Sequence, residues 1–279
     1  MSEPRVERRS ISVQKDAYVA EVVLLGPGKG NAMGPDFWRE LPAAFDELDR
    51  DEDVRAIVVR GQGGHFSYGL DLMAMGGALG PLVMGPLMAG AAERTKLLAL
   101  IGELQHAFNR VAGCRKPVIA AVTGWCIGGG VDLIAACDVR LCAADAKFSV
   151  REVKVAMVAD LGSLQRLPHI IGEGHARELA MSGKNIDAAR ALRIGLVNDV
   201  LETEATLLDA ARSLAREMAE SSPLVVQGIK EVMNDRVRGE VTEGLRRVAL
   251  WNSAFLQSAD LGEAFAAFAE KRPPKFLGK

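Results

Sequence analysis

The sequence predicts an α/β fold in which most strands pair in parallel. Short, apolar, β-branched runs alternate with segments of helical periodicity up to residue 204, and only helical patterns follow from Ala205 onward. The chain has 279 residues and a hydrophobic content of 49%, so it can bury a substantial core. We therefore expect an α/β core at residues 1–204 and a helical region at residues 205–279.

Four strands are expected in the core. They lie at Tyr18–Leu25, Val54–Arg60, Pro117–Val122 and Val139–Ala143. Each run is rich in valine, isoleucine, leucine or alanine, and turn-forming or charged residues separate it from the next element. Their separation leaves room for helices between them, as parallel strands require.

The helices of the core are expected from about Gly34 to Arg50, from Leu97 to Val111 and from near Gly129. The helical region should contain helices at residues 205–221, 223–235, 241–254 and 262–271. Its apolar residues Leu250, Trp251 and Phe255 need a partner surface, which predicts self-association.

Composition excludes several functional classes. The net charge of −2 gives no support for nucleic-acid binding, which needs a concentrated basic surplus. No apolar run follows the N-terminal charges, so the sequence predicts no secretory signal. The cysteines show no C-x-x-C spacing and lie in apolar contexts, namely Cys114, Cys126, Cys137 and Cys142. This pattern favours reduced thiols and a cytoplasmic protein.

A metal, a redox cofactor and a membrane span are also not expected. The histidines form no cluster with metal-ligand spacing. The segment Leu70–Ala92 is long and apolar with one charge, Asp71, but its many glycines and prolines argue against a spanning helix. We expect it to be a mobile loop that lines an apolar pocket, with Met73–Ala92 helping to shape that pocket.

The glycine cluster Gly128–Gly130 opens an alanine-rich helix. A dinucleotide fingerprint would need a third glycine where Leu133 stands, and a P-loop would need lysine and a hydroxyl where Gly130 and Val131 stand. Both phosphate-binding interpretations therefore fail. Close packing of a helix start and a site for a developing negative charge remain open on these residues.

Three carboxylates follow the cluster. Asp132 lies in the first turn of the expected helix, and Glu152 and Asp160 come 20 and then 8 residues later. An anion site beside carboxylates suggests proton transfer next to a carbonyl group. Each acid also has a purely structural alternative: complementing the helix dipole, lying on the surface, or capping a helix.

Motifs across the chain resemble the crotonase, or enoyl-CoA hydratase/isomerase, superfamily. The two oxyanion-loop motifs are Phe66–Leu72 and Cys126–Leu133, and three others occur in the family's order at Asn31–Met33, Glu152–Val153 and Gly162–Pro168. The similarity runs from about Ile11 to the end of the chain. It is greatest to the dienoyl-CoA isomerases, through Asn31–Leu41, Gly130–Leu133, Val150–Val153, Ala159–Pro168 and Trp251–Ser253.

The resemblance implies a spiral of ββα units with a helical C-terminal region. It also implies homotrimers, usually paired into hexamers, and an acyl-CoA substrate with no separate cofactor. The backbone N–H groups of Leu70 and Gly129 would bind the thioester oxygen. Glu152 would remove the proton at C2, Asp160 would supply the proton at C6, and Asp132 would assist Glu152. Substrate contacts would fall on Lys29, Ala32, Ser67, Tyr68, Gly69, Asp71, Leu72 and Gly128.

These residues favour the conversion of a 3,5-dienoyl-CoA to a 2,4-dienoyl-CoA. Hydration of a 2-enoyl-CoA stays open as the alternative, although Asp132 replaces a typical hydratase glutamate and Asp160 replaces a usual glycine. A non-catalytic, acyl-CoA-binding role also stays open as an interpretation, although the three retained acids argue against it. Tyr68 departs from the small residue common in the family, and this leaves the width of the CoA channel undetermined.

Overall fold

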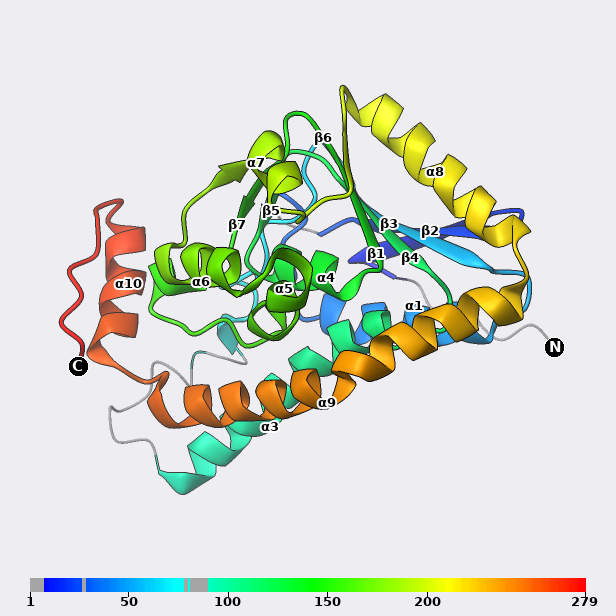
Figure 1. Ribbon diagram of the computed structural model, residues 1–279. Helices are drawn as coiled ribbons and strands as arrows, with labels where there is room; N and C mark the ends of the chain where they lie inside the picture. Colours follow the sequence, from blue (N-terminus) through cyan, green and yellow to red (C-terminus); the bar gives the residue numbers. More distant parts are fainter. Residues whose placement is uncertain (1–7, 27–28, 78–79, 81–89) are drawn as a thin grey trace.

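The main sheet of the protein is built mostly from parallel strands. A computed structural model describes residues 8–26, 29–77, 80 and 90–279 (Figure 1). The strand order is β1-β2-β3-β4-β6-β9, and each adjacent pair is parallel except the β1-β2 hairpin. The bounds are Ile11–Asp16 (β1), Val19–Leu24 (β2), Ala56–Gly61 (β3), Val118–Val122 (β4), Val139–Ala143 (β6) and Asp199–Leu201 (β9). The predicted α/β class is confirmed.

A smaller sheet connects the main sheet to the glycine cluster. It contains β5 (Trp125–Ile127), β7 (Lys147–Ser149) and β8 (Ile186–Asp187), in that order. Strand β5 pairs parallel with β7 and leads directly into helix α4, Gly129–Ala136. The sequence did not predict these strands, because two or three residues are too few to show an alternating pattern.

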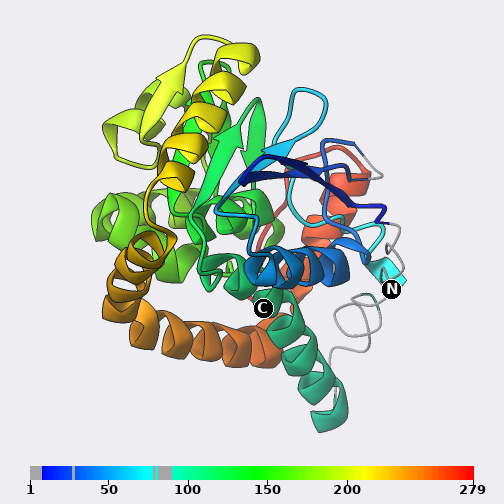
Figure 2. The ribbon, with the colours of Figure 1, turned by 90° about the vertical axis from the view of Figure 1, so that its right-hand side faces the viewer.

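Helices cover both faces of the main sheet. The helices in the described ranges are α1 (Phe37–Arg50), α3 (Ala91–Ala112), α4, α5 (Ser163–Ile171), α6 (Glu173–Ser182), α7 (Ala188–Arg193), α8 (Glu204–Glu220), α9 (Pro223–Phe255) and α10 (Ala259–Ala269), with a 3₁₀ turn η1 at Glu152–Val155. Alternate side chains of each central strand serve opposite faces. Val58 of β3 packs with Ala211 of α8, whereas its neighbour Val59 joins the larger core with Phe45 and Phe108. Figure 2 shows α8 along its face of the sheet.

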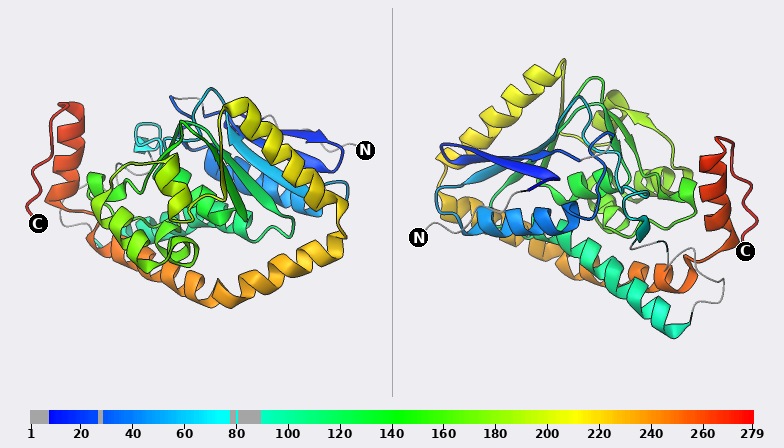
Figure 3. Two further views of the ribbon diagram at one scale, coloured as in Figure 1. Left: turned by 45° about the horizontal axis from the view of Figure 1, so that its top comes forward. Right: turned by 180° about the vertical axis from the view of Figure 1, so that it is seen from behind.

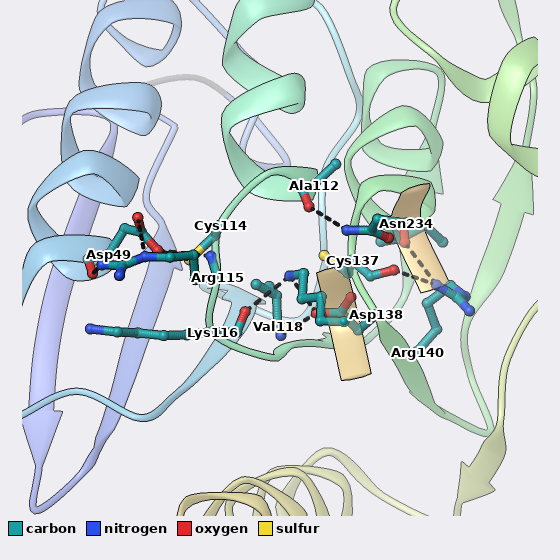
Figure 4. A network of polar contacts seen from close by, with 12 residues as sticks. Asp49, Ala112, Cys114, Arg115, Lys116, Val118, Cys137, Asp138, Arg140 and Asn234 are labelled. Carbon is teal, nitrogen blue, oxygen red and sulfur yellow. Dashed lines mark hydrogen bonds and ion pairs between the residues drawn. The ribbon is translucent and has the colours of Figure 1, made fainter. Parts of the chain in front are cut away.

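Helix α9 is continuous where the sequence suggested two helices, at 223–235 and 241–254. Its N-terminal half is fixed to the residues just before strands β4 and β6. Lys230 Nζ donates to Asp138 Oδ2 at 2.7 Å and to the Lys116 carbonyl at 2.9 Å. Asn234 donates to the Ala112 carbonyl at 3.2 Å (Figure 4). Its C-terminal half packs on α3. This two-point attachment explains why residues 236–240 remain helical.

The C-terminal helices carry exposed apolar side chains. Leu250, Trp251 and Phe255 are 42%, 55% and 60% exposed, and the two aromatic rings lie 4.7 Å apart. Helix α10 stands at the end of the molecule away from β1 and β2 (Figure 3). No helix within the described ranges has the length and apolar character needed to cross a membrane. Most of the predicted pocket-shaping segment, residues 78–79 and 81–89, lies outside the described residues.

Candidate active site

The two glycine-containing loops predicted from the sequence lie side by side. Ser67 and Cys126 form an isolated parallel bridge. Around it, the Ser67 N–H donates to the Trp125 carbonyl at 3.0 Å, and the Ile127 N–H donates to the Ser67 carbonyl at 2.9 Å. Because parallel segments advance in step, the residues that follow, Leu70 and Gly129, lie at the same end of the pair.

The loops approach so closely that glycine is required at position 69 of the first loop. A β-carbon on Gly69, whose φ is +80°, would lie 2.6 Å from the Ile127 carbonyl oxygen and 2.9 Å from the Gly129 nitrogen. A β-carbon on Gly129 would lie 3.7 Å from the Leu70 nitrogen. Within the part of the chain that the structure describes, neither the Leu70 nor the Gly129 N–H has a protein acceptor. Two neighbouring free donors can bind an anionic oxygen.

Asn31 and Ser67 hold the first loop in this position. Asn31 is buried with a φ of +52°, and its Nδ2 donates to the Gln62 and His65 carbonyls, both at 2.8 Å. Ser67 Oγ donates to the Asn31 carbonyl at 2.9 Å and accepts from the Gly69 N–H at 3.0 Å. Asparagine tolerates this left-handed backbone better than most residues. The sequence motif included Asn31, but its contacts were not anticipated.

Glu152 lies against the second loop. A β-carbon on Gly128, whose φ is +53°, would lie only 3.3 Å from Glu152 Oε1. The other oxygen, Oε2, is buried and has no hydrogen-bond partner among the described residues. Burial, followed by the negative charges of Asp132 and Asp160, raises the pKa of Glu152 well above its usual value. A carboxylate with these properties is suited to accept a proton beside the free N–H pair.

Asp132 is fully buried at the start of α4. Its Oδ1 accepts from the Ser163 N–H, the first residue of α5, at 2.5 Å. Its Oδ2 is buried without a hydrogen-bond partner in the described ranges. Burial raises its pKa to about 6, although the Ser163 hydrogen bond and the charge of Arg166 act against this shift. Complementing the α4 dipole is therefore not its only role, because it also joins the starts of two helices.

Asp160 is held from α9. Asn252 Nδ2 donates to Asp160 Oδ2 at 2.7 Å, and Gln105 Nε2 donates to the Asp160 carbonyl, also at 2.7 Å. Burial raises the pKa of Asp160 to about 7 and the charge of Asp132 adds to this, while the Asn252 hydrogen bond lowers it. Asp160 does not cap α5, whose N-cap is Gly162. The structural alternative for Asp160 is excluded, and a protonated carboxyl is favoured up to neutral pH.

An apolar cavity of about 440 Å³ opens beside Glu152. Residues of η1, its flanking segments, α5 and α6 line it, chiefly Val150, Val153, Met157, Val158, Ala159, Leu164, Leu167, Pro168, Ala176, Ala180 and Met181. Polar or charged groups at its wall include Ser163, Glu173 and Arg177. The cavity suits an apolar chain whose polar end reaches Glu152.

The other predicted contact residues lie around the first loop. Ala32 and Leu72 are half-buried and Lys29 is exposed. The Asp71 carboxylate accepts from the Ala74 N–H at 2.9 Å, so it supports a local turn. The Tyr68 ring covers Gly30, where a β-carbon would lie 2.7 Å from ring atoms. The Tyr68 ring therefore packs on the turn that also carries Lys29.

A buried arginine lies behind the acids. Arg166 donates to Asn109 Oδ1 at 2.6 Å and packs over Gly162, where a β-carbon would lie 1.8 Å from Arg166 Nη1. Its charge lowers the pKa of Asp132. The motif Gly162–Pro168 contained Arg166 and Ser163, but neither side chain was singled out. Glycine is needed at position 162 because the Arg166 guanidinium occupies the space that a β-carbon would take.

Comparisons with known proteins agree with this geometry. The sequence model described as enoyl-CoA hydratase/isomerase matches residues 14–279. A mitochondrial delta(3,5)-delta(2,4)-dienoyl-CoA isomerase of Dictyostelium discoideum is 45% identical and covers 93% of this chain and 87% of its own. A peroxisomal protein of the same name from Arabidopsis thaliana is 41% identical, covering 94% and 93%. A solved enoyl-CoA hydratase/isomerase of Pseudoalteromonas atlantica superimposes with a TM-score of 0.83 at 25% identity, covering 96% and 100%.

The expected cytoplasmic location is contradicted by these relatives. Their names place them in mitochondria and peroxisomes. The expectation came from a missing apolar signal and from reduced cysteines. A missing apolar signal bears only on secretion, and buried thiols persist wherever the surroundings are reducing. Neither feature distinguishes the cytoplasm from an organelle.

Proposed function

Because the chain belongs to the enoyl-CoA hydratase/isomerase family, we propose that it converts a 3,5-dienoyl-CoA to the 2,4-dienoyl-CoA. One observation carries the proposal: a second carboxyl, Asp160, lies near enough to Glu152 for its charge to raise the pKa of Glu152, which itself lies at the cavity and against the loop of the free Gly129 N–H. A shift of two conjugated double bonds needs a proton removed at one carbon and another supplied four carbons away.

The proposed reaction begins at C2. Glu152 takes the C2 proton, and the electrons of that bond move toward the thioester carbonyl, whose oxygen becomes negative. The N–H groups of Leu70 and Gly129 bind this oxygen, and such a donor typically contributes roughly 3 kcal/mol to the transition state. Gly128, next to the second donor, leaves the space in which the Glu152 carboxylate lies.

The reaction ends at C6. Electrons return from the enolate through the conjugated system, double bonds form at C2–C3 and C4–C5, and C6 takes the proton of Asp160. Glu152 then holds one proton more than before and Asp160 one fewer, so the site must exchange protons before the next turnover. Asp132, whose charge acts on both acids, is proposed to assist this redistribution.

Coenzyme A enters as part of the substrate. The proposed acid, base and oxyanion donors are all groups of this chain, so the reaction needs no separate cofactor. We assign the thioester-proximal contacts to Ser67, Gly69 and Gly128, which shape the two loops. The pantetheine and nucleotide are assigned to Lys29, Ala32, Tyr68, Asp71 and Leu72 on the adjoining segments.

Hydration of a 2-enoyl-CoA is the alternative activity. It would use the same oxyanion donors and Glu152 to activate a water molecule. The second acid at this position, Asp132, is occupied through Oδ1 by the Ser163 N–H and has only Oδ2 unengaged. Asp160 has no evident task in hydration, which is why isomerisation is preferred.

We also propose that the chain forms homotrimers that can pair into hexamers. The support is the exposed apolar surface of α9 and α10, in particular Leu250, Trp251, Phe255 and Phe268. Within residues 205–279, α8 packs on the sheet, so α9 and α10 supply the proposed contacts. Light scattering should give the mass of three or six chains, and a monomer would contradict the assignment.

The principal test compares two variants on a 3,5-dienoyl-CoA. Formation of the 2,4-diene is followed by absorbance, and exchange of the C2 hydrogen in D2O is followed by NMR. Glu152→Gln should lose both reactions. Asp160→Asn should lower isomerisation by about 10²–10⁴-fold and keep the C2 exchange, because it removes only the acid. Full isomerisation by Asp160→Asn would contradict the proposal, as would rapid hydration of a 2-enoyl-CoA without any diene shift by the wild type.

A further inference from the structure

The carboxyl of Asp160 is oriented by a side chain that comes 92 residues later in the sequence. Asn252 lies on α9, is 2% exposed, and donates from Nδ2 to Asp160 Oδ2 at 2.7 Å. The same Nδ2 donates to the Val158 carbonyl at 2.9 Å. Both N–H bonds of this amide group are therefore used, one for the backbone before Asp160 and one for its carboxyl.

These two acceptors determine which way the amide faces. An amide nitrogen only donates and an amide oxygen only accepts, so a reversed Asn252 would place its oxygen against two acceptors. The Val158 carbonyl can never donate, so it selects the orientation in which Nδ2 faces both. In that orientation Asp160 Oδ2 receives a hydrogen bond and has no need of a proton of its own.

The position of Asn252 is itself fixed. On either side along α9, Ala249 and Leu256 are buried with Leu97 and Ile101 of α3. Gln105, also on α3, makes a second link, because its Nε2 donates to the Asp160 carbonyl at 2.7 Å and to the Leu245 carbonyl of α9 at 3.1 Å. The backbone and the side chain of Asp160 are thus held to the same pair of helices.

From this geometry we propose that Asn252 is a positioning residue: it holds Asp160 Oδ2 as an acceptor and leaves Oδ1 to carry the proton delivered to the substrate. The inference depends on the proposed function, in which Asp160 supplies the proton at C6. Without the Asn252 donor, the proton can occupy either oxygen and the carboxyl can rotate. Fewer of its conformations then deliver a proton in the required direction.

The test replaces Asn252 by leucine, which has a similar volume and no donor. The matched control is Asn234→Leu. Asn234 also lies on α9, but in its N-terminal half, and the substitution removes an amide donor to the Ala112 carbonyl of α3. Asn252→Leu should lower kcat for diene isomerisation by roughly 10- to 100-fold with little change in KM, because orientation and not binding is lost. C2 exchange in D2O should stay near the wild-type rate, and Asn234→Leu should leave both reactions unchanged.

A pH profile separates positioning from a general loosening of the fold. The Asn252 hydrogen bond lowers the pKa of Asp160, so its removal raises that pKa. The protonated acid then persists to higher pH, and the alkaline limb of the kcat profile should move upward. Loss of folded protein alone would lower the whole profile without moving this limb.

A second variant keeps the experiment decisive if leucine prevents folding. Asn252→Asp preserves the shape of the side chain and removes the obligatory donors, so it too should lower kcat and move the alkaline limb upward. Folded Asn252 variants with wild-type kcat and an unmoved alkaline limb would overturn the positioning role. A wild-type protein that exchanges C2 hydrogen but forms no 2,4-diene would instead overturn the proposed function, so the two failures are distinguishable.

Discussion

At the scale of single residues, the site is a set of acids that burial keeps partly protonated. Burial raises the pKa of Asp132 to about 6 and the pKa of Asp160 to about 7. Burial also raises the pKa of Glu152, and the negative charges of Asp132 and Asp160 raise it further. Such interacting groups titrate together, so a pH profile reports on the set. In the proposed reaction, the productive state has Glu152 ionised and Asp160 protonated.

Asp132→Asn should move the whole activity profile to lower pH. The charge of Asp132 raises the pKa of both Glu152 and Asp160, so its removal lowers both values. Glu152 then becomes an ionised base at lower pH, and Asp160 loses its proton at lower pH. Measuring kcat for isomerisation from pH 5 to pH 9 tests this. A profile in which either limb stays in place would show that Asp132 does not act on that group.

The sequence singled out the three acids, and the structure places them close enough for their charges to interact. The contacts that orient them were not predictable. The motifs placed Glu152 and Asp160 at the site through resemblance. The contacts join distant positions: Ser163 lies 31 residues after Asp132, and Asn252 lies 92 residues after Asp160. No periodic pattern connects such pairs, because they meet only after α4, α5 and α9 have packed.

At the scale of elements, the turn after β7 forms a thin wall between two cavities. The main cavity of about 440 Å³ and a smaller one of about 180 Å³ share the lining residues Val153, Met157 and Val158. Trp251 and Phe255 of α9 line the smaller cavity. The backbone here bends sharply through Ala156, whose φ is +55°. Side chains rather than secondary structure separate the two spaces.

Met157→Ala should therefore extend the acyl chains that the protein accepts. Removing this side chain joins the cavities, and each additional buried methylene contributes roughly 0.8 kcal/mol, about fourfold in kcat/KM. The ratio of kcat/KM for longer over shorter dienoyl-CoA substrates should rise. The matched control, Met181→Ala, alters the main cavity away from the shared wall and should leave that ratio nearly unchanged. If this kcat/KM ratio were the same in both variants, Met157 would not separate the two cavities.

Apolar strands were predicted well from the sequence. A polar strand and the uninterrupted length of α9 were predicted less well. The strand expected at Val139–Ala143 has those bounds in the structure. The hairpin partner β1 was not recognised, since its residues after Val13 are polar and mostly exposed. The break expected after residue 235 is absent, because buried contacts from Lys230 and Asn252 outweigh the weak helix propensity of Gly239.

At the scale of the whole molecule, parallel pairing beyond the main sheet brings the functional loops together. The bridges Met33–Leu70 and Ser67–Cys126 extend this pairing past the sheet edge, toward the start of α4. Helix α9 then crosses the molecule along α3 and supplies Asn252 (Figures 1 and 2). The site thus depends on both the α/β core and the helical region, which explains why the crotonase resemblance had to span nearly the whole chain.

The buried acids should make the protein less stable as the pH rises from 5 to 8. A carboxyl whose pKa is raised by folding favours the folded state below its unfolded pKa of roughly 4, and this contribution is lost as the pH passes its folded pKa. For Asp132 and Asp160 that loss begins above the unfolded pKa and is complete near pH 6 and pH 7, respectively. Glu21 and Asp49, whose pKa values are lowered, act only in more acidic solution, and the pKa of Cys114, about 11, lies above the range.

Thermal unfolding of the wild type and Asp160→Asn isolates one of these acids. The pKa of Asp160 rises from 3.8 to about 7, which corresponds to a cost on the order of 4 kcal/mol when the group is fully ionised. The amide carries no charge at either pH, so the variant should lose less Tm than the wild type between pH 5 and pH 8. It should be the more stable protein at pH 8 and lose that advantage at pH 5. Equal losses of Tm would mean that Asp160 is solvated in the folded protein, and a stabilised, poorly active variant would show that the acid is retained at a cost to stability.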